Sequence, residues 1–137
     1  MVDIDFLASV DVCDSWLITE SWHGAYENHS FIPPREDFIR NAQATDVPMV
    51  GICIGHQIIA QNLGGKVTKF DEEYLVGCPA YRWGFDDIML NAWHQDQVLT
   101  LLTKAKSIAH NAFCKNAAVF YGQPAFTCNR TPNLAIR

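Results

Sequence analysis

The stretch VPMVGICIGHQIIAQNLGG, residues 47–65, joins an apolar run to a helical pattern through a cysteine that stands between two glycines. VPMVGIC is continuously apolar, which is typical of a strand buried on both faces of a parallel sheet. GHQIIAQNL has the spacing of a helix, and the pair Gly64-Gly65 ends it. The stretch therefore predicts a strand that turns sharply into a helix.

A similar strand and helix precede this stretch. SWLIT, residues 15–19, is a short candidate for a buried strand. Pro33 and Pro34 open a helix over REDFIRNAQA, with acidic residues in its first turn. The order strand, helix, strand, helix predicts a layered α/β fold.

The second half of the chain carries strands and little helix. KVTKF, LVGCPAYRW and DIMLNAW are strand-like, and SIAHNA, AAVFYG and AFTCN follow as a meander whose last pair turns at residues 122–124. We expect several of these strands to be antiparallel or to lie at a sheet edge. The whole length, residues 1–137, suits one domain with a core of its own.

Composition excludes several classes of protein. A net charge of −5 argues against nucleic acid as a partner. The N-terminus is acidic where a secretion signal would be basic, so we expect no such signal. Gly, His and Gln interrupt the apolar stretch around residues 50–60, so we expect no membrane span.

Five cysteines, an odd number without a Cys-x-x-Cys pair, fit neither a disulfide framework nor a zinc site and favour a reducing cytoplasm. No metal constellation stands out. Apart from Cys53, the cysteines are interpreted as small core residues: Cys13, Cys78, Cys114 and Cys128.

Gly51-x-Cys53-x-Gly55 has the spacing of a nucleophile elbow with cysteine in place of serine. Such a turn needs both glycines, because side chains beside a strained residue would clash with the crowded backbone. The Cys53 sulfur would then lie at a helix N-terminus, where the dipole favours a thiolate. The backbone N–H of Ile54 would point toward the oxygen of an attacked carbonyl. A buried cysteine at a strand end has the same spacing, but the flanking strand and helix favour the elbow.

Four segments follow one another over nearly the whole chain: DSWLITESWHGAYEN (14–28), GICIGHQIIAQNLGG (51–65), NAWHQDQV (91–98) and AKSIAHNAFCKNAAVFYGQPAFTC (105–128). Together they resemble the class I glutamine amidotransferases, in the form of a stand-alone domain similar to the glutaminase part of GMP synthase. The resemblance implies a three-layer, flavodoxin-like sheet, mainly parallel with added antiparallel strands. It implies no cofactor.

The resemblance also implies a reaction. Cys53 would attack the side-chain amide of glutamine, release ammonia and form a glutamyl thioester, which water would then hydrolyse. The backbone N–H groups of Ile54 and of Glu20, in the loop after the first strand, would form the oxyanion hole. Four residues would lie near the bound glutamine: Gln57, His94, Gln95 and Asp96.

The catalytic set departs from the family at its end. Where the family has His-Pro-Glu after the last meander strand, this chain has Thr131, Pro132 and Asn133. A threonine cannot take the thiol proton near neutral pH, and an asparagine cannot hold an imidazolium by charge. We therefore expect turnover to be weak or absent.

Two further departures concern Glu20 and the length of the chain. The family has glycine at position 20, and a carboxylate beside Cys53 would oppose both a thiolate and an oxyanion unless it turns to solvent. Family members usually begin with a strand and a helix that the first nine residues are too short to supply. The loss would leave a bare apolar face and unpaired backbone, so we expect copies of the chain to associate as a homo-oligomer.

Other histidines are candidates for the missing base. His94, oriented by Asp96, is the best of them, although a substrate contact explains it as well, and His56 is expected to face away along its helix. His23 and His29 could line the mouth of the site or could be ordinary surface residues. The alternative to an enzyme is a non-catalytic module that binds glutamine, a γ-glutamyl compound or another protein. In the family, a separate synthetase domain or subunit uses the ammonia.

Overall fold

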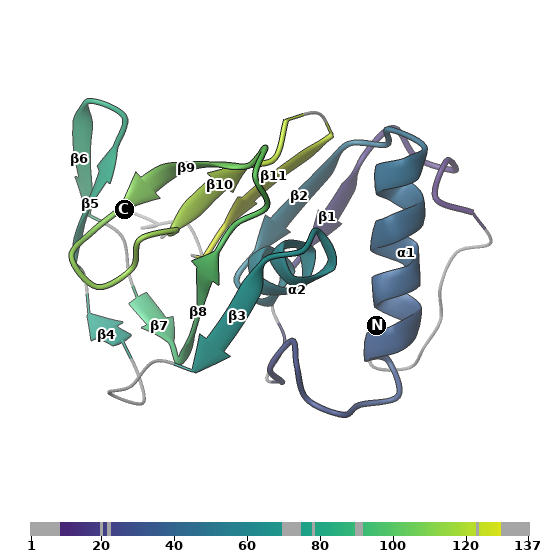
Figure 1. Cartoon of the computed structure of the whole chain (residues 1–137), viewed down its shortest axis with the longest axis horizontal. Coiled ribbons are helices and arrows are strands. Elements are labelled where there is room, and N and C mark those ends of the chain that lie inside the picture. Colours follow the sequence, from purple (N-terminus) through teal and green to yellow (C-terminus); the bar gives the residue numbers. More distant parts are fainter. Residues whose placement is uncertain are drawn as a thin grey trace, which may run out of the picture.

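The computed structural model describes residues 9–19, 21, 23–69, 75–77, 79–89, 92–122 and 124–129. In this part of the chain, seven strands form one sheet, with two smaller two-stranded sheets beside it (Figure 1). The large sheet contains, in spatial order, β1 (Trp16–Ile18), β2 (Met49–Ile52), β11 (Ala125–Cys128), β10 (Ala118–Phe120), β9 (Lys106–His110), β5 (Ala80–Trp83) and β6 (Asp86–Met89). The small sheets pair β3 (Lys66–Lys69) with β8 (Asp96–Thr100), and β4 (Leu75–Gly77) with β7 (Ala92–His94).

The parallel part of the large sheet consists of β1, β2 and β11. The pairs β11–β10, β10–β9, β9–β5 and β5–β6 are antiparallel. The α/β fold class is confirmed, as are the antiparallel meander and its final turn. Antiparallel strands take a larger share than the sequence suggested, because short connections rather than helical crossovers join β5 to β6, β9 to β10 and β10 to β11.

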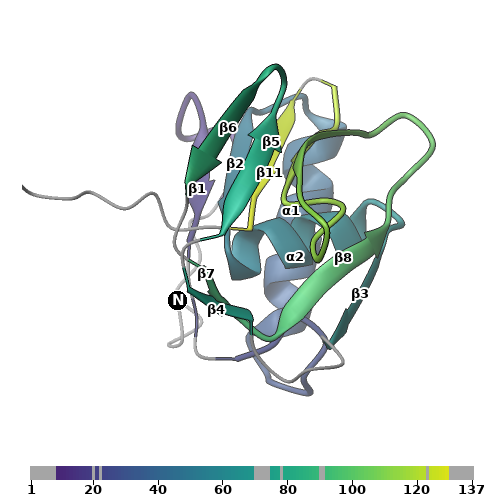
Figure 2. The same cartoon turned by 90° about the vertical axis from the view of Figure 1, so that its left-hand side faces the viewer.

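Two helices cover one face of the sheet, α1 (Ile32–Ala44) and α2 (Ile54–Asn62) (Figure 2). Ile58 and Ile59 of α2 are fully buried and share a hydrophobic cluster with Ile39 of α1 and Met49 of β2. This cluster fixes the position of α2 against the parallel strands. In the described part of the chain, neither helix is long and apolar enough to cross a membrane.

Two local predictions need correction. Helix α1 begins at Ile32, before the proline pair, so Glu36 and Asp37 fall beyond its first turn. Cys13 is exposed rather than a core residue, because it lies in the irregular segment before β1. Cys114 is buried as expected, and Cys128 is partly buried.

The face of the sheet opposite the helices carries a row of apolar side chains. Leu17 pairs with Val50, Val50 with Phe126, and Phe126 with Phe120, so the four lie side by side on β1, β2, β11 and β10. Leu17, Val50 and Phe120 are 56%, 37% and 42% exposed, and no helix in the described residues covers them. Among the strands that the structure describes, β1 is at the edge of the sheet. We call these four residues the open face.

Candidate functional site

The candidate site lies where the three parallel strands end. Because β1, β2 and β11 run in the same direction, their carboxyl ends meet at one edge of the sheet. The loop that leads to α1 follows β1, Cys53 follows β2 and Asn129 follows β11. In open α/β sheets, ligands bind in the crevice outside the carboxyl ends of the strands.

Cys53 occupies a strained turn between β2 and α2. Its backbone has φ 55° and ψ −111°, a conformation that residues with a side chain rarely adopt, and it is the N-cap of α2. Its carbonyl oxygen accepts a hydrogen bond from the Gln57 amide over 3.2 Å, and its own amide donates to the carbonyl of Cys128 over 3.0 Å. Cys53 is partly exposed. The positive end of the α2 dipole therefore lies beside a partly exposed cysteine.

Both glycines of the turn are required by close backbone contacts. A Cβ atom on Gly55 would lie 2.0 Å from the carbonyl oxygen of Ile18 in β1. A Cβ atom on Gly51 would lie 2.6 Å from the carbonyl oxygen of Gly55. The tight packing of β1 against the start of α2 thus has the geometry expected of a nucleophile elbow.

A buried polar network lies beside the elbow. The side-chain amide of Gln57 donates to the backbone carbonyl of Asp96 and to the Asn129 side-chain oxygen, each over 3.4 Å. Asn129 Nδ2 also donates to the Asp96 carbonyl over 3.4 Å. The Tyr26 hydroxyl donates to Asp96 Oδ1 over 2.7 Å. The structure thus brings together Gln57 and Asp96, two of the residues predicted from the sequence.

Two members of this network were not identified from the sequence, Tyr26 and Asn129. Desolvation, followed by the hydrogen bond to Asp96, raises the pKa of Tyr26 to about 12, so its hydroxyl remains a donor at neutral pH. The position of Asn129, directly after the last parallel strand, is the signal that could have revealed it.

The remaining predicted site residues are only partly described. Ile54 is the first residue of α2 and is buried. His94 ends β7, where its backbone pairs with Leu75, and Gln95 joins β7 to β8. The side chain of His94 and the whole of Glu20, Thr131 and Asn133 lie outside the described residues.

His56 points into the core. Its ring is fully buried, and Nδ1 lies 2.7 Å from the Thr127 hydroxyl on β11. This agrees with the expectation that His56 faces away from the thiol.

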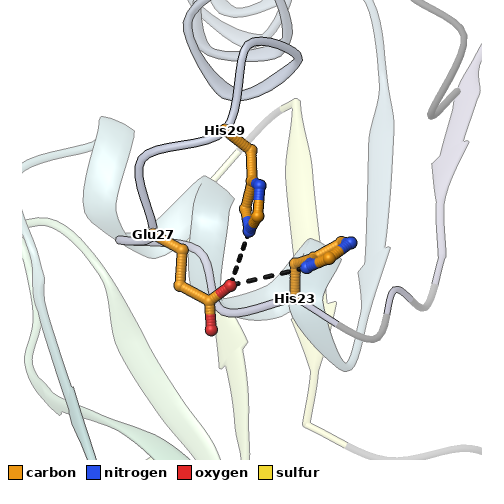
Figure 3. Close-up of side chains that lie close together, drawn as sticks. All are labelled: His23, Glu27 and His29. Carbon is orange, nitrogen blue, oxygen red and sulfur yellow. Dashed lines mark hydrogen bonds and ion pairs between the residues drawn. The ribbon is translucent and has the colours of Figure 1, made fainter.

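The loop between β1 and α1 contains a cluster that the sequence did not reveal. His23 and His29 both contact the same carboxylate oxygen of Glu27, Oε2 (Figure 3). No metal constellation was expected from the sequence, yet the spacing His-x3-Glu-x-His within one loop was the available signal.

The sequence model of the family described as "Glutamine amidotransferase class-I" matches residues 24–122. The chain belongs to the class I glutamine amidotransferase family. This range contains the elbow, Gln57 and Asp96, so the family assignment and the geometry of the site concern the same part of the molecule.

Two relatives of different kinds are similar to this chain in sequence. The chain is 34% identical over 88 residues to a subunit of the glutamine-hydrolyzing GMP synthase of Archaeoglobus fulgidus, an alignment that covers 54% of this chain and 45% of the relative. It is 28% identical over 128 residues to gamma-glutamyl peptidase 4 of Arabidopsis thaliana, covering 82% of this chain and 51% of the relative. The chain thus spans about half the length of these two proteins.

Solved structures share the amidotransferase fold. A glutamine amidotransferase from Methylobacillus flagellatus superimposes with a TM-score of 0.84 at 22% identity, covering 92% of this chain and 54% of that one. A glutamine amidotransferase from Thermotoga maritima superimposes with a TM-score of 0.76 at 22% identity, covering 84% and 55%. At this identity the likeness concerns the fold.

Proposed function

We propose that the chain is a glutaminase-type domain in which Cys53 attacks the side-chain amide of glutamine. The observation that carries this proposal is the conformation of Cys53, strained at the N-terminus of α2 between two glycines that tolerate no side chain. The sulfur would form a bond to the amide carbon, the carbon–nitrogen bond would break, and the nitrogen would leave as ammonia once protonated. Water would then hydrolyse the thioester to glutamate and restore the thiol.

The residues around Cys53 have distinct roles in this proposal. The backbone N–H groups of Ile54 and Glu20 would stabilise the oxyanion. Gln57, His94, Gln95 and Asp96 would bind glutamine. The burial of Gln57 and Asp96, 4% and 3% exposed, supports a rigid wall rather than a flexible surface. The hydrogen bond from Tyr26 would hold the Asp96 carboxylate in that wall.

We propose further that turnover is weak or absent. Thr131 and Asn133 stand where the family has histidine and glutamate. A positioned base contributes about 10²–10⁴-fold to a rate, and the departing nitrogen needs a proton that neither residue supplies near neutral pH. The helix dipole at Cys53 favours the attacking thiolate but gives the leaving group no proton.

A non-catalytic module that binds glutamine or another protein is the alternative. It would keep the wall formed by Gln57 and Asp96, while Cys53 would take part in no reaction.

We also propose a cytoplasmic location, a synthetase-type partner if ammonia is released, and a homo-oligomer in which a second copy covers the open face. The exposure of that apolar row supports the homo-oligomer.

An electrophilic glutamine analogue tests the proposed attack. We expect it to label Cys53 in the wild-type chain, as located by peptide mass spectrometry, and to leave Cys53→Ala unlabelled. Excess glutamine should protect the thiol. If the analogue labels exposed Cys13 as fast as Cys53, without protection by glutamine, the proposed site is wrong.

A further inference from the structure

The loop between β1 and α1 presents three metal-ligating side chains to a common point, as Figure 3 shows. Glu27 Oε2 lies 2.7 Å from His29 Nε2 and 3.5 Å from His23 Nδ1. The three ligand atoms all lie within 4.8 Å of one another. The cluster takes no part in the proposed attack on glutamine.

Packing within the loop holds the two imidazoles in place. The rings of His23 and His29 have centroids 4.0 Å apart, and His29 stacks on Phe31 with an interplanar angle of 7°. Backbone hydrogen bonds from Glu27 to Gly24 and from His29 to Glu27 form consecutive turns. The loop therefore arranges the three side chains before any ligand arrives, which lowers the entropy lost on binding.

The distances suit a tetrahedral ion after a small adjustment. Bonds of about 2.0–2.1 Å place neighbouring ligand atoms of a tetrahedral zinc about 3.3 Å apart. The separation of His23 and Glu27 is already close to this value, and the contact between His29 and Glu27 would have to lengthen. All three side chains are 35–39% exposed, so they can move by that amount and an ion can reach them.

The charge of the cluster favours a cation. Glu27 supplies a carboxylate whose Oε2 atom lies 2.7 Å from His29 Nε2 and 3.5 Å from His23 Nδ1. Two imidazoles and one carboxylate are ligands for zinc and similar transition metals, whereas magnesium and calcium prefer oxygen ligands alone.

We propose that His23, Glu27 and His29 form a binding site for a divalent transition metal of the zinc type. Three protein ligands leave one coordination position for water or an anion.

This metal site would also stabilise the loop that borders the candidate glutamine site. Tyr26, next to Glu27 in the chain, bonds to Asp96, whose backbone accepts from Gln57. Metal binding at the loop would thus restrict the segment that positions the Tyr26 hydroxyl. The metal site itself does not depend on the proposed chemistry of Cys53.

Titration with Co²⁺, followed by competition with Zn²⁺, tests the site on the full chain. We expect one equivalent of Co²⁺ to give the visible absorption of a tetrahedral site without a thiolate charge-transfer band, and Zn²⁺ to displace it. Single variants His23→Gln, Glu27→Gln and His29→Gln should each weaken binding by roughly 10-fold or more. His110→Gln, an exposed histidine on β9, is the matched control and should bind as the wild type does.

Thermal unfolding in chelator-treated buffer shows whether each variant folds. With folded variants, unchanged cobalt affinity in all three would overturn the proposal, as would equal loss in His110→Gln. A thiolate band that disappears in Cys53→Ala would also overturn it, since the ion would then be at the elbow.

Discussion

The amide of Cys53 donates a hydrogen bond to the carbonyl oxygen of Cys128 over 3.0 Å. This bond continues the pairing of β2 with β11 to the point where both strands end. The elbow and the segment after β11 are therefore neighbours at one edge of the sheet. A base carried a few residues after Cys128 would approach the thiol from this direction, and Thr131 and Asn133 occupy that part of the sequence.

A histidine at position 131 and a glutamate at position 133 should increase the rate of glutamine hydrolysis. The double variant Thr131→His/Asn133→Glu supplies a proton carrier and an acid to orient it. We expect its release of ammonia from glutamine to exceed that of the wild type by at least about 10²-fold. The triple variant, which adds Cys53→Ala, is the control and should release no ammonia from glutamine. Equal ammonia release by the double variant and the wild type would show that the altered residues are not what limits turnover.

Substitution of Gly55 by alanine should disrupt the elbow. The new Cβ would lie 2.0 Å from a backbone oxygen of β1, which no rotamer change relieves. We expect a loss of more than about 3 kcal/mol in the free energy of unfolding, measured by urea denaturation. Gly24→Ala is the matched control, because its nearest contacts, 3.4 Å and beyond, are to side chains. Similar losses in both variants would contradict this account of the turn.

The buried contact between His56 and Thr127 should contribute to stability. Thr127→Val keeps the shape of the side chain but removes the hydroxyl that lies 2.7 Å from His56 Nδ1. We expect a loss of about 1–3 kcal/mol in the free energy of unfolding, and a smaller loss in Thr127→Ser, which keeps a hydroxyl. A valine variant as stable as the wild type would mean that this hydrogen bond contributes nothing net.

Stability should fall in alkaline solution because of Cys114. Desolvation raises the pKa of this thiol from 9.0 to about 11. Above pH 9 the unfolded chain loses the thiol proton while the folded chain keeps it, so unfolding becomes easier as the pH rises from about 9 to 11. Urea midpoints measured across this range should decline less steeply in Cys114→Ala than in the wild type. If the urea midpoints of the two proteins decline equally with pH, other groups cause the loss of stability. Tyr121 is one such group, because burial raises its pKa to about 12.

The open face should drive association of the chain. Leu17, Val50 and Phe120 form an exposed apolar row beside an edge strand. We expect sedimentation at micromolar concentration to show a species larger than the monomer, and Val50→Lys to shift it toward the monomer. Leu102→Lys, at a 43% exposed residue outside the row, should have no such effect. If the wild type is a monomer throughout this concentration range, the proposed homo-oligomer is wrong.

The sequence predicted the elements whose local pattern is strong. The apolar run that leads into Gly51-x-Cys53-x-Gly55 predicted β2, the turn and α2. Each glycine meets a steric requirement of the turn, and the neighbouring residues in the sequence indicate that requirement. The pairing of β3 with β8 and the network through Tyr26 and Asn129 were not predicted. These contacts join residues far apart in the chain, and no local periodicity encodes them. The histidine cluster was missed for another reason: the spacing His-x3-Glu-x-His lies in a loop, and it indicates a cluster only once the turns of that loop are known.

Release of ammonia from glutamine by the wild-type chain, measured beside Cys53→Ala, tests the central claim most directly. A sulfur held at the elbow without a proton carrier should give multiple-turnover rates near those of Cys53→Ala, even where a glutamine analogue labels the thiol. Sustained release by the wild type at about 10²-fold or more above Cys53→Ala would show that a positioned base is present after all, and would contradict the account.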